Sequence, residues 1–186
     1  MKYNKENFKS TFLYWNERIS AFKLPDWDEL PVFELYMDQV VKLLNGYLDI
    51  YAEASTDKKG ITQSMINNYV KLKIIPCPQK KKYSRIHLAY LIIVCVLKQT
   101  LSISTIQNII PLGISENDVK KIYTSFVSNQ RKSYQYISEN ISNVANSLIE
   151  NEGDNPERLN DLVMQMASSA NIFKMMSDIF CNTDEN

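Results

Sequence analysis

The sequence predicts an all-helical protein, and three observations support this fold class. Only four glycines and six prolines occur in 186 residues, so turn-forming residues are too scarce for many short strands. Apolar residues recur at three- and four-residue steps along most of the chain, which is the spacing of one face of an α-helix. Hydrophobic residues make up 45% of the composition, which is ordinary for a globular protein and argues against a disordered chain.

The predicted helices follow one another with few interruptions. We expect them over residues 5–22, 35–53, 62–72, 85–99, 102–110, 115–151 and 157–181. The helix over 85–99 is apolar nearly all round, which predicts that it is buried in a core. Thr62 and Ser84 are plausible N-caps of the helices that follow them. Gly60, in the polar connection before the third helix, suits a left-handed backbone position.

The last two helices are predicted to form an antiparallel hairpin that offers a surface for dimer formation. In the long helix, the apolar stripe through Val119 is out of phase with a second stripe formed by Ile137, Ile141, Val144 and Leu148. The long helix therefore either bends across 129–133 or exchanges partners there. The last helix is expected to bury Leu159, Leu162, Val163, Met166, Ala170, Phe173, Met176 and Phe180.

Cysteine usage and the N-terminus predict a soluble protein in a reducing, cytoplasmic compartment. Cys77, Cys95 and Cys181 are far apart and odd in number, so they form neither a disulfide framework nor a metal-ligand pair. The lysines near the N-terminus are not followed by the apolar core of a signal peptide. The most apolar run, 88–97, is shorter than the ~20 residues that span a bilayer.

Charge is segregated along the chain, although the formal net charge is zero. Residues 58–115 contain no Asp or Glu but hold nine cations, namely Lys58, Lys59, Lys71, Lys73, Lys80, Lys81, Lys82, Arg85 and Lys98. The compensating acidic residues lie mainly in 1–57 and 150–186. A basic block of this kind points to a polyanionic partner, and the alternative is a solvated surface with chance clustering.

The helix over 62–72 carries a polar stripe that is suited to contact with DNA. Ser64, Asn67, Asn68 and Lys71 stand at positions i, i+3, i+4 and i+7, opposite the apolar residues of this helix. Asn can hydrogen-bond adenine edges, and Lys can bind phosphate or guanine. A solvated face would usually include Glu, which this one lacks. We therefore predict that this stripe faces the major groove, and the alternative is a solvent face that happens to carry Asn.

The segment after this helix predicts a basic wing. Pro76 and Pro78 keep the chain extended, and the lysines behind them would bind backbone phosphates without reading sequence. The DNA-binding residues predicted here are Lys80, Lys81, Lys82, Tyr83 and Arg85. Tyr83 is expected mainly to support the wing and the core, with a hydroxyl that could reach phosphate. A flexible basic loop is the alternative.

These residues resemble the N-terminal winged helix-turn-helix of the MerR family. Tyr69, Ile74, Ile75, Pro76 and Tyr83 match its spacing, whereas this chain has Asn67 at the position of the recognition-helix Arg and Lys73 at that of a Gly. The sequence is more closely similar to a bacterial family catalogued as domain of unknown function 1836. That resemblance covers roughly residues 25–125, through the segments 30–31, 34–40, 61–62, 65–71, 80–85, 87–89 and 97–98. It implies a MerR-like regulator.

Together these observations predict three regions. They are an N-terminal amphipathic helix (1–24), a MerR-like winged helix-turn-helix DNA-binding domain (25–114) and a C-terminal hairpin (115–186) for dimerisation or effector binding. We expect a transcription regulator, a repressor, that binds double-stranded DNA as a homodimer and responds to an unknown small-molecule effector. Two alternatives stay open: an adaptor whose basic segment binds an acidic protein surface, and a small-molecule sensor with no DNA role.

Nothing in the sequence predicts an enzyme. The single histidine, His87, has no partner carboxylate beside it in sequence and is expected to cap or pack. The four glycines form no phosphate-binding loop, and no nucleophile motif occurs. Acidic clusters around 26–29 and 150–154 fall near expected helix ends, where they act as caps and solvated turns. We therefore expect no metal and no cofactor.

Overall fold

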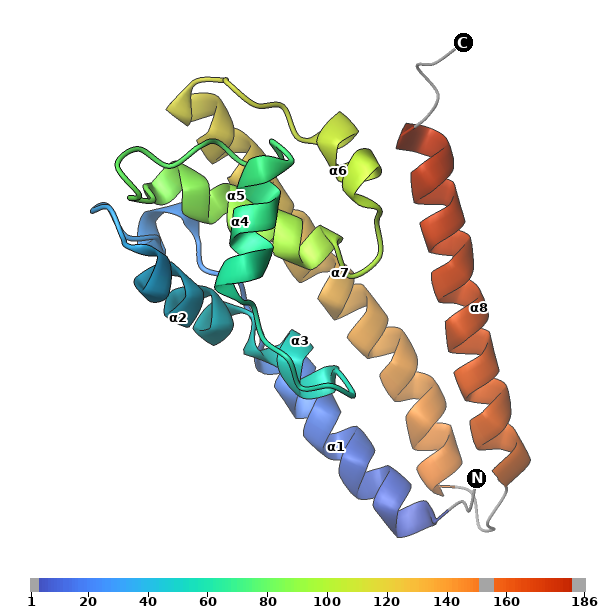
Figure 1. The fold of residues 1–186 in the computed structure, drawn as a ribbon. Helices are drawn as coiled ribbons and strands as arrows, with labels where there is room; N and C mark the ends of the chain where they lie inside the picture. The colour runs from blue at the N-terminus through green and yellow to red at the C-terminus, as the bar shows by residue number, and fades with distance from the viewer. Residues whose placement is uncertain (1–3, 151–155, 182–186) are drawn as a thin grey trace. The chain divides into compact units, whose positions relative to one another are not determined.

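The computed structural model describes residues 4–150 and 156–181 and is all-helical over these ranges (Figure 1). The described residues form eight α-helices and one 3₁₀ turn, and their β-type pairings are two isolated bridges. The all-helical prediction is confirmed. The chain divides into a larger compact unit, Lys23–Asn129, and a smaller one made of Met1–Phe22 and Gln130–Asn186. The predicted domain limit at 114 falls inside the larger unit.

The larger unit contains most of the short elements. They are η1 (Trp27–Glu29), α2 (Met37–Tyr47), α3 (Asp49–Ala54), α4 (Gln63–Lys71), α5 (Arg85–Leu97), α6 (Ile103–Ile109) and the first half of α7 (Glu116–Glu150). The single helix predicted over 35–53 is wrong, because the backbone breaks at Leu48 (φ −121°, ψ 22°) into α2 and α3. The Leu48 side chain is nevertheless buried, so the apolar periodicity continues across a break that it could not reveal.

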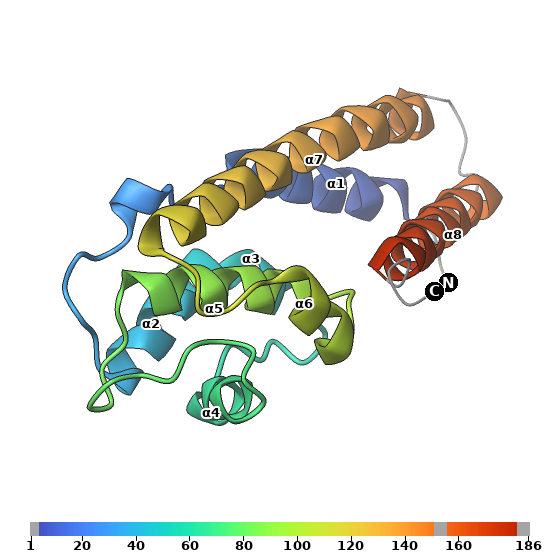
Figure 2. The same cartoon turned by 90° about the horizontal axis from the view of Figure 1, so that it is seen from above.

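Helix α5 is the centre of the larger unit. All ten residues of His87–Val96 are buried, as the apolar sequence predicts. In Figure 2, α5 lies between α4 and the first half of α7. Since burying one large aliphatic side chain contributes about 1.5–3 kcal/mol, α5 supplies much of the stability of this unit.

Two tyrosine hydroxyls tie the loops of the larger unit to its helices. Tyr123, fully buried on α7, donates a hydrogen bond to the Pro25 carbonyl (2.8 Å), and its ring meets the edge of Trp27. Tyr90 on α5 donates to the Pro111 carbonyl (2.7 Å). These two bonds satisfy carbonyl groups of irregular segments, which have no partner within a helix.

The smaller unit contains α1 (Lys5–Ala21), the second half of α7 and α8 (Pro156–Cys181). The Asn16 side chain of α1 accepts hydrogen bonds from the Ser138 and Ser142 hydroxyls of α7 (3.0 and 3.1 Å). The Phe22 ring packs against Tyr134, with centroids 5.5 Å apart. The apolar stripe of α1, formed by Phe8, Phe12, Trp15 and Ile19, is half-buried, and no residue of this helix is fully buried.

Two predictions for the last helices have different outcomes. Helix α7 is continuous, and the division of the two units at Asn129 coincides with the phase change, so α7 exchanges partners there. The side chains of Val144 and Leu148 in its second stripe lie outside the described residues. The burial predicted for α8 is wrong: only Leu159 and Leu162 of the predicted set are partly covered, and Phe173 is 63% exposed. Apolar spacing indicates which side of a helix is suited to packing, but it does not show that another element covers that side.

Candidate nucleic-acid interface

Helix α4 exposes the polar stripe predicted from the sequence. Ser64, Asn67, Asn68 and Lys71 are all exposed, whereas Ile66 and Tyr69 on its other side are buried. Thr62 caps the helix by accepting a hydrogen bond from the Met65 backbone N–H (3.3 Å). In Figure 2, α4 lies on the side of α5 opposite the first half of α7, so its outer face is open.

The connection that leads into α4 is held by one side chain of α2. Asn45 donates a hydrogen bond to the Ile61 carbonyl (2.9 Å) and accepts one from the Ile61 backbone N–H (2.8 Å). A Cβ atom on Gly60 would overlap the Asn45 side chain. The left-handed position predicted for Gly60 is wrong, because the positive φ in this connection belongs to Lys58 (47°). Gly60 is required for close approach, which fixes where α4 begins.

The chain leaves α4 through a hydrogen-bonded end that contains a lysine in an unusual conformation. Lys73 has a φ of 53°, and its N–H donates to the Val70 carbonyl (3.0 Å) while the Ile74 N–H donates to the Tyr69 carbonyl (2.9 Å). This is a Schellman end, whose left-handed residue is usually Gly. A lysine there is strained by about 1–2 kcal/mol.

Lysines also form the tight turn that follows. Lys80 and Lys81 have φ values of 48° and 62°, and the Lys82 N–H donates to the Gln79 carbonyl (2.8 Å). Positive φ at both central residues defines a type I′ turn, for which Asn-Gly is the favoured sequence. Both lysines are exposed. This turn thus carries two cations at positions where Asn and Gly would be less strained.

Residues from the start of α2 lie beside this turn. Leu35 and Tyr83 exchange backbone hydrogen bonds of 2.9 Å in both directions. This pairing brings Glu34 within 3.8 Å of the Lys82 ammonium, which also lies 5.8 Å from the centre of the Tyr36 ring. The basic block is therefore not free of carboxylates in three dimensions. Glu34 is distant from Lys82 in sequence, and no sequence signal pairs the two.

Two residues predicted to contact DNA are occupied within the molecule. Tyr83 is 3% exposed, and its ring meets the edge of the His87 ring, so its hydroxyl cannot serve as a surface contact. The Arg85 guanidinium donates two hydrogen bonds to the Leu30 carbonyl (2.8 and 3.2 Å) and lies over the Trp27 ring. We correct the predicted interface by removing both side chains, because each holds the 30–35 segment against α5.

His87 caps α5, one of the two roles expected for it. Its Nδ1 accepts a hydrogen bond from the Ser84 backbone N–H (3.1 Å). Its Nε2 is buried and has no hydrogen-bond partner in the part of the chain that the structure describes. Burial lowers the pKa of His87, and the Cys77 backbone and the Glu34 carboxylate oppose this shift with smaller effects.

Residues 25–137 match the profile of the domain of unknown function 1836, more than half of the chain. The chain belongs to the DUF1836 family. In this DUF1836 protein the matched region runs from η1 into α7 and includes every residue of the candidate interface, whereas α1 and α8 lie outside it. A search of curated proteins and of solved structures finds no significant match.

The described part of this DUF1836 chain offers neither a metal-ligand cluster nor a membrane-spanning helix. No group of three or more His, Cys, Asp or Glu side chains is placed to hold a metal ion there. Helices that are both long enough and apolar enough to pass through a bilayer are also absent from the described ranges.

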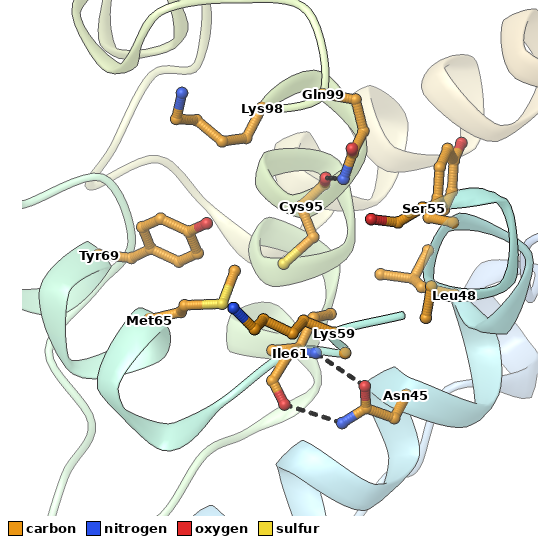
Figure 3. A pocket seen from close by; sticks show the side chains of 13 residues that line it. Asn45, Leu48, Ser55, Lys59, Ile61, Met65, Tyr69, Cys95, Lys98 and Gln99 are labelled. Atoms are coloured by element: carbon orange, nitrogen blue, oxygen red, sulfur yellow. Dashed lines mark hydrogen bonds between the residues drawn. The ribbon is translucent and has the colours of Figure 1, made fainter. Parts of the chain in front are cut away.

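A small cavity lies behind α4 in the DUF1836 region, between this helix, α3 and α5 (Figure 3). Its volume is about 110 Å³. Met65 and Tyr69 of α4 form one wall, and Cys95 of α5 forms another. Any molecule in this cavity would therefore contact the helix that carries the polar stripe on its other face.

Proposed function

We propose that this protein is a DNA-binding transcription regulator with a MerR-like winged helix-turn-helix. In this proposal α4 is the recognition helix, and the turn at Lys80-Lys81 is the tip of the wing. The observation that carries the proposal is the exposed face of α4, which holds Ser, two Asn and Lys and no carboxylate. Asn and Lys are side chains that read base edges and bind phosphates.

The strained lysines support the same function. The MerR pattern has Gly at the position of Lys73, and this residue has the left-handed backbone that Gly adopts most easily. Residues held in strained conformations cluster at functional sites, where the side chain is retained for its chemistry. Lys73, Lys80 and Lys81 follow α4 directly and would bind phosphates on either side of the groove that α4 enters. Lys82 contributes less, since Glu34 partly neutralises it.

A second copy of the chain is part of the proposal, because one recognition helix buries too little surface for tight, specific binding. Helix α8 offers the surface. At 100° per residue, its exposed apolar side chains cover an arc of about 260°, more than twice the ~100° that one packed neighbour needs. They are Val163, Met164, Met166, Ile172, Phe173, Met175, Met176, Ile179 and Phe180.

The area of this apolar arc suits a stable dimer. These side chains are between 37% and 65% exposed. With roughly 150–250 Å² for each large side chain, half-exposure leaves on the order of 700 Å² per protomer. A stable protein–protein interface buries about 800 Å² on each partner.

The dimer is tested by comparing two neighbouring substitutions on α8. Ile172→Glu places a charge in the apolar arc, whereas Asn171→Glu places the same charge on the polar side of the helix. We expect sedimentation to give a dimer for the wild type and for Asn171→Glu, and a monomer for Ile172→Glu. A wild-type monomer at all concentrations would contradict the dimer.

DNA binding is tested by selecting bound duplexes from a random pool at low salt. A common sequence should emerge, and its affinity should fall steeply with salt because lysines displace counterions from phosphates. Asn67→Ala should weaken binding by about 1–3 kcal/mol and relax the preference at one base pair, whereas Lys81→Ala should weaken all sequences equally and flatten the salt dependence. The matched control is Lys121→Ala, on α7.

One observation favours the adaptor as a second candidate function. Val32 and Phe33 are 80% and 65% exposed, in the segment that pairs with the basic turn. Exposed apolar side chains beside charged ones are typical of protein-binding surfaces. If no duplex is retained at low salt and an acidic protein is captured instead, with capture lost in Phe33→Ser, the adaptor replaces the regulator.

A further inference from the structure

The Tyr69 hydroxyl faces the cavity behind α4. The Tyr69 side chain is 4% exposed, and Figure 3 shows its hydroxyl pointing into the cavity toward Cys95. Among the residues that the structure describes, none forms a hydrogen bond with this hydroxyl. Because this hydroxyl makes no hydrogen bond within that part of the chain, it can donate one to an occupant of the cavity.

Further donors line the cavity, and the Gln99 amide beside them donates to the Cys95 carbonyl (3.2 Å). Burial raises the pKa of both Tyr69 and Cys95 to about 12, so each keeps its proton at neutral pH. The Ser55 hydroxyl points into this space, and the Lys59 side chain, which is 81% exposed, runs along its edge beside Met65 (Figure 3). Asn45 is fully used by Ile61 and is not available to a ligand.

The charge around the cavity is positive. No Asp or Glu lines it, whereas Lys59 and Lys98 do. Lys59 forms only a solvent-exposed ion pair with Asp57 (3.5 Å), which is worth little and is easily replaced. Lys98 points away from the centre of the cavity, with its ammonium 3.5 Å from the Leu101 carbonyl. An occupant would therefore meet the charge of Lys59.

We propose that this cavity binds a small organic acid, with its carboxylate held by Lys59, Ser55 and the Tyr69 hydroxyl. Its hydrocarbon part would contact Leu48 and Met65, which supply apolar walls. The volume of about 110 Å³ sets the size, because an apolar cavity of about 150 Å³ holds benzene with six non-hydrogen atoms. A short-chain carboxylate with about four to six non-hydrogen atoms fits, with its charged end toward the opening.

The regulatory consequence rests on the proposed DNA binding, whereas the binding site itself does not. Met65 and Tyr69 belong to α4 and line the cavity on the side opposite Asn67. A ligand would add contacts to α4 and so select one position of this helix relative to α5. If the ligand binds one position of α4 more tightly than another, it changes the affinity of the protein for DNA by some factor. DNA then changes the affinity of the protein for the ligand by the same factor.

The experiment titrates the full-length protein with butyrate and follows amide shifts by NMR. Butyramide, which has the same size and no charge, is the control ligand. We expect saturable shifts with butyrate in α3, α4 and α5, and at least tenfold weaker binding of butyramide. Tyr69→Phe and Lys59→Met should each weaken butyrate binding about tenfold or more, since each removes a donor to a charged acceptor. Ala52→Leu, which fills the cavity, should abolish binding.

Lys98→Met is the matched control for Lys59→Met, because it removes a charge that points away from the cavity, and it should leave butyrate binding within a factor of two or three. The proposal is overturned if butyrate does not bind, if butyramide binds equally well, or if Ala52→Leu leaves butyrate binding intact. Adding butyrate to a DNA titration separates the two claims. If butyrate binds saturably and the protein has no affinity for DNA, the proposed regulatory function is wrong and the proposed butyrate site stands.

Discussion

The two units of this protein differ in whether they carry their own core. In the larger unit, α5 is buried along ten consecutive residues, and buried tyrosines satisfy loop carbonyls. In the smaller unit, α1 has no fully buried residue, and among the described side chains of α8 none is buried. Apolar side chains thus build a core inside the larger unit, whereas on α8 of the smaller unit they are largely exposed. We expect substitutions in the two units to act on different measurements.

The largest effect is expected at the centre of the larger unit. Ile92 is fully buried on α5, so Ile92→Ala should lower the free energy of unfolding by about 2–5 kcal/mol through lost burial and a cavity. Urea unfolding followed by Trp27 fluorescence in a Trp15→Phe background measures this unit alone. Ile172→Ala, at a side chain that is 55% exposed, is the control and should change this transition by less than about 0.5 kcal/mol. Equal losses of unfolding free energy in Ile92→Ala and Ile172→Ala would contradict the distinction between the two units.

A smaller loss is expected where α4 is attached to the larger unit. Gly60→Ala places a Cβ atom against Asn45 and should destabilise this unit by about 1–3 kcal/mol, as overpacking does. Gly46→Ala is the matched control. Nothing surrounds a Cβ atom at Gly46, which lies inside α2, so it should raise stability by up to about 1 kcal/mol. The same sign for both substitutions, measured by thermal unfolding, would contradict this explanation of Gly60.

The strained turn should show opposite signs for stability and binding. Replacing Lys80-Lys81 with Asn-Gly relieves two positive-φ lysines and should stabilise the protein by about 1 kcal/mol or less, because Gly also gains entropy in the unfolded chain. The same double substitution should weaken binding to all duplexes and flatten the salt dependence. Calorimetry and a DNA titration on one sample measure both. If the double substitution raises stability and leaves the affinity for DNA unchanged, the turn is not part of the DNA interface.

The smallest effect concerns pH and His87. Burial lowers its pKa below the ordinary 6.5, so the unfolded chain takes up a proton before the folded protein does. Stability should therefore be full above pH 6.5 and fall as the pH drops toward the folded-state pKa. His87→Gln keeps a side-chain acceptor for the Ser84 N–H and should flatten this dependence, as measured by urea unfolding between about pH 7.5 and 5.5. If the dependence of stability on pH is unchanged in His87→Gln, other titratable groups cause it.

Much of the larger unit could be predicted because local signals and burial agree there. The caps Thr62 and Ser84, the buried α5 and the exposed stripe of α4 all follow from residue spacing. The break at Leu48 could not be predicted, since it keeps the apolar period while changing the backbone. The supporting role of Tyr83 was predicted, whereas its backbone pairing with Leu35 and the role of Arg85 were missed, because the partners Leu35 and Leu30 lie about fifty residues earlier in the chain.

The sequence by itself determined the helices, the position of the basic block and which sides of α4 and α5 are apolar. These properties depend on side chains a few residues apart, whose geometry a helix dictates. Only the tertiary structure decided that Glu34 lies beside Lys82, that three lysines after α4 adopt left-handed backbone, and that Tyr69 points into a cavity. Each of these depends on contacts between distant segments, and only packing fixes such contacts.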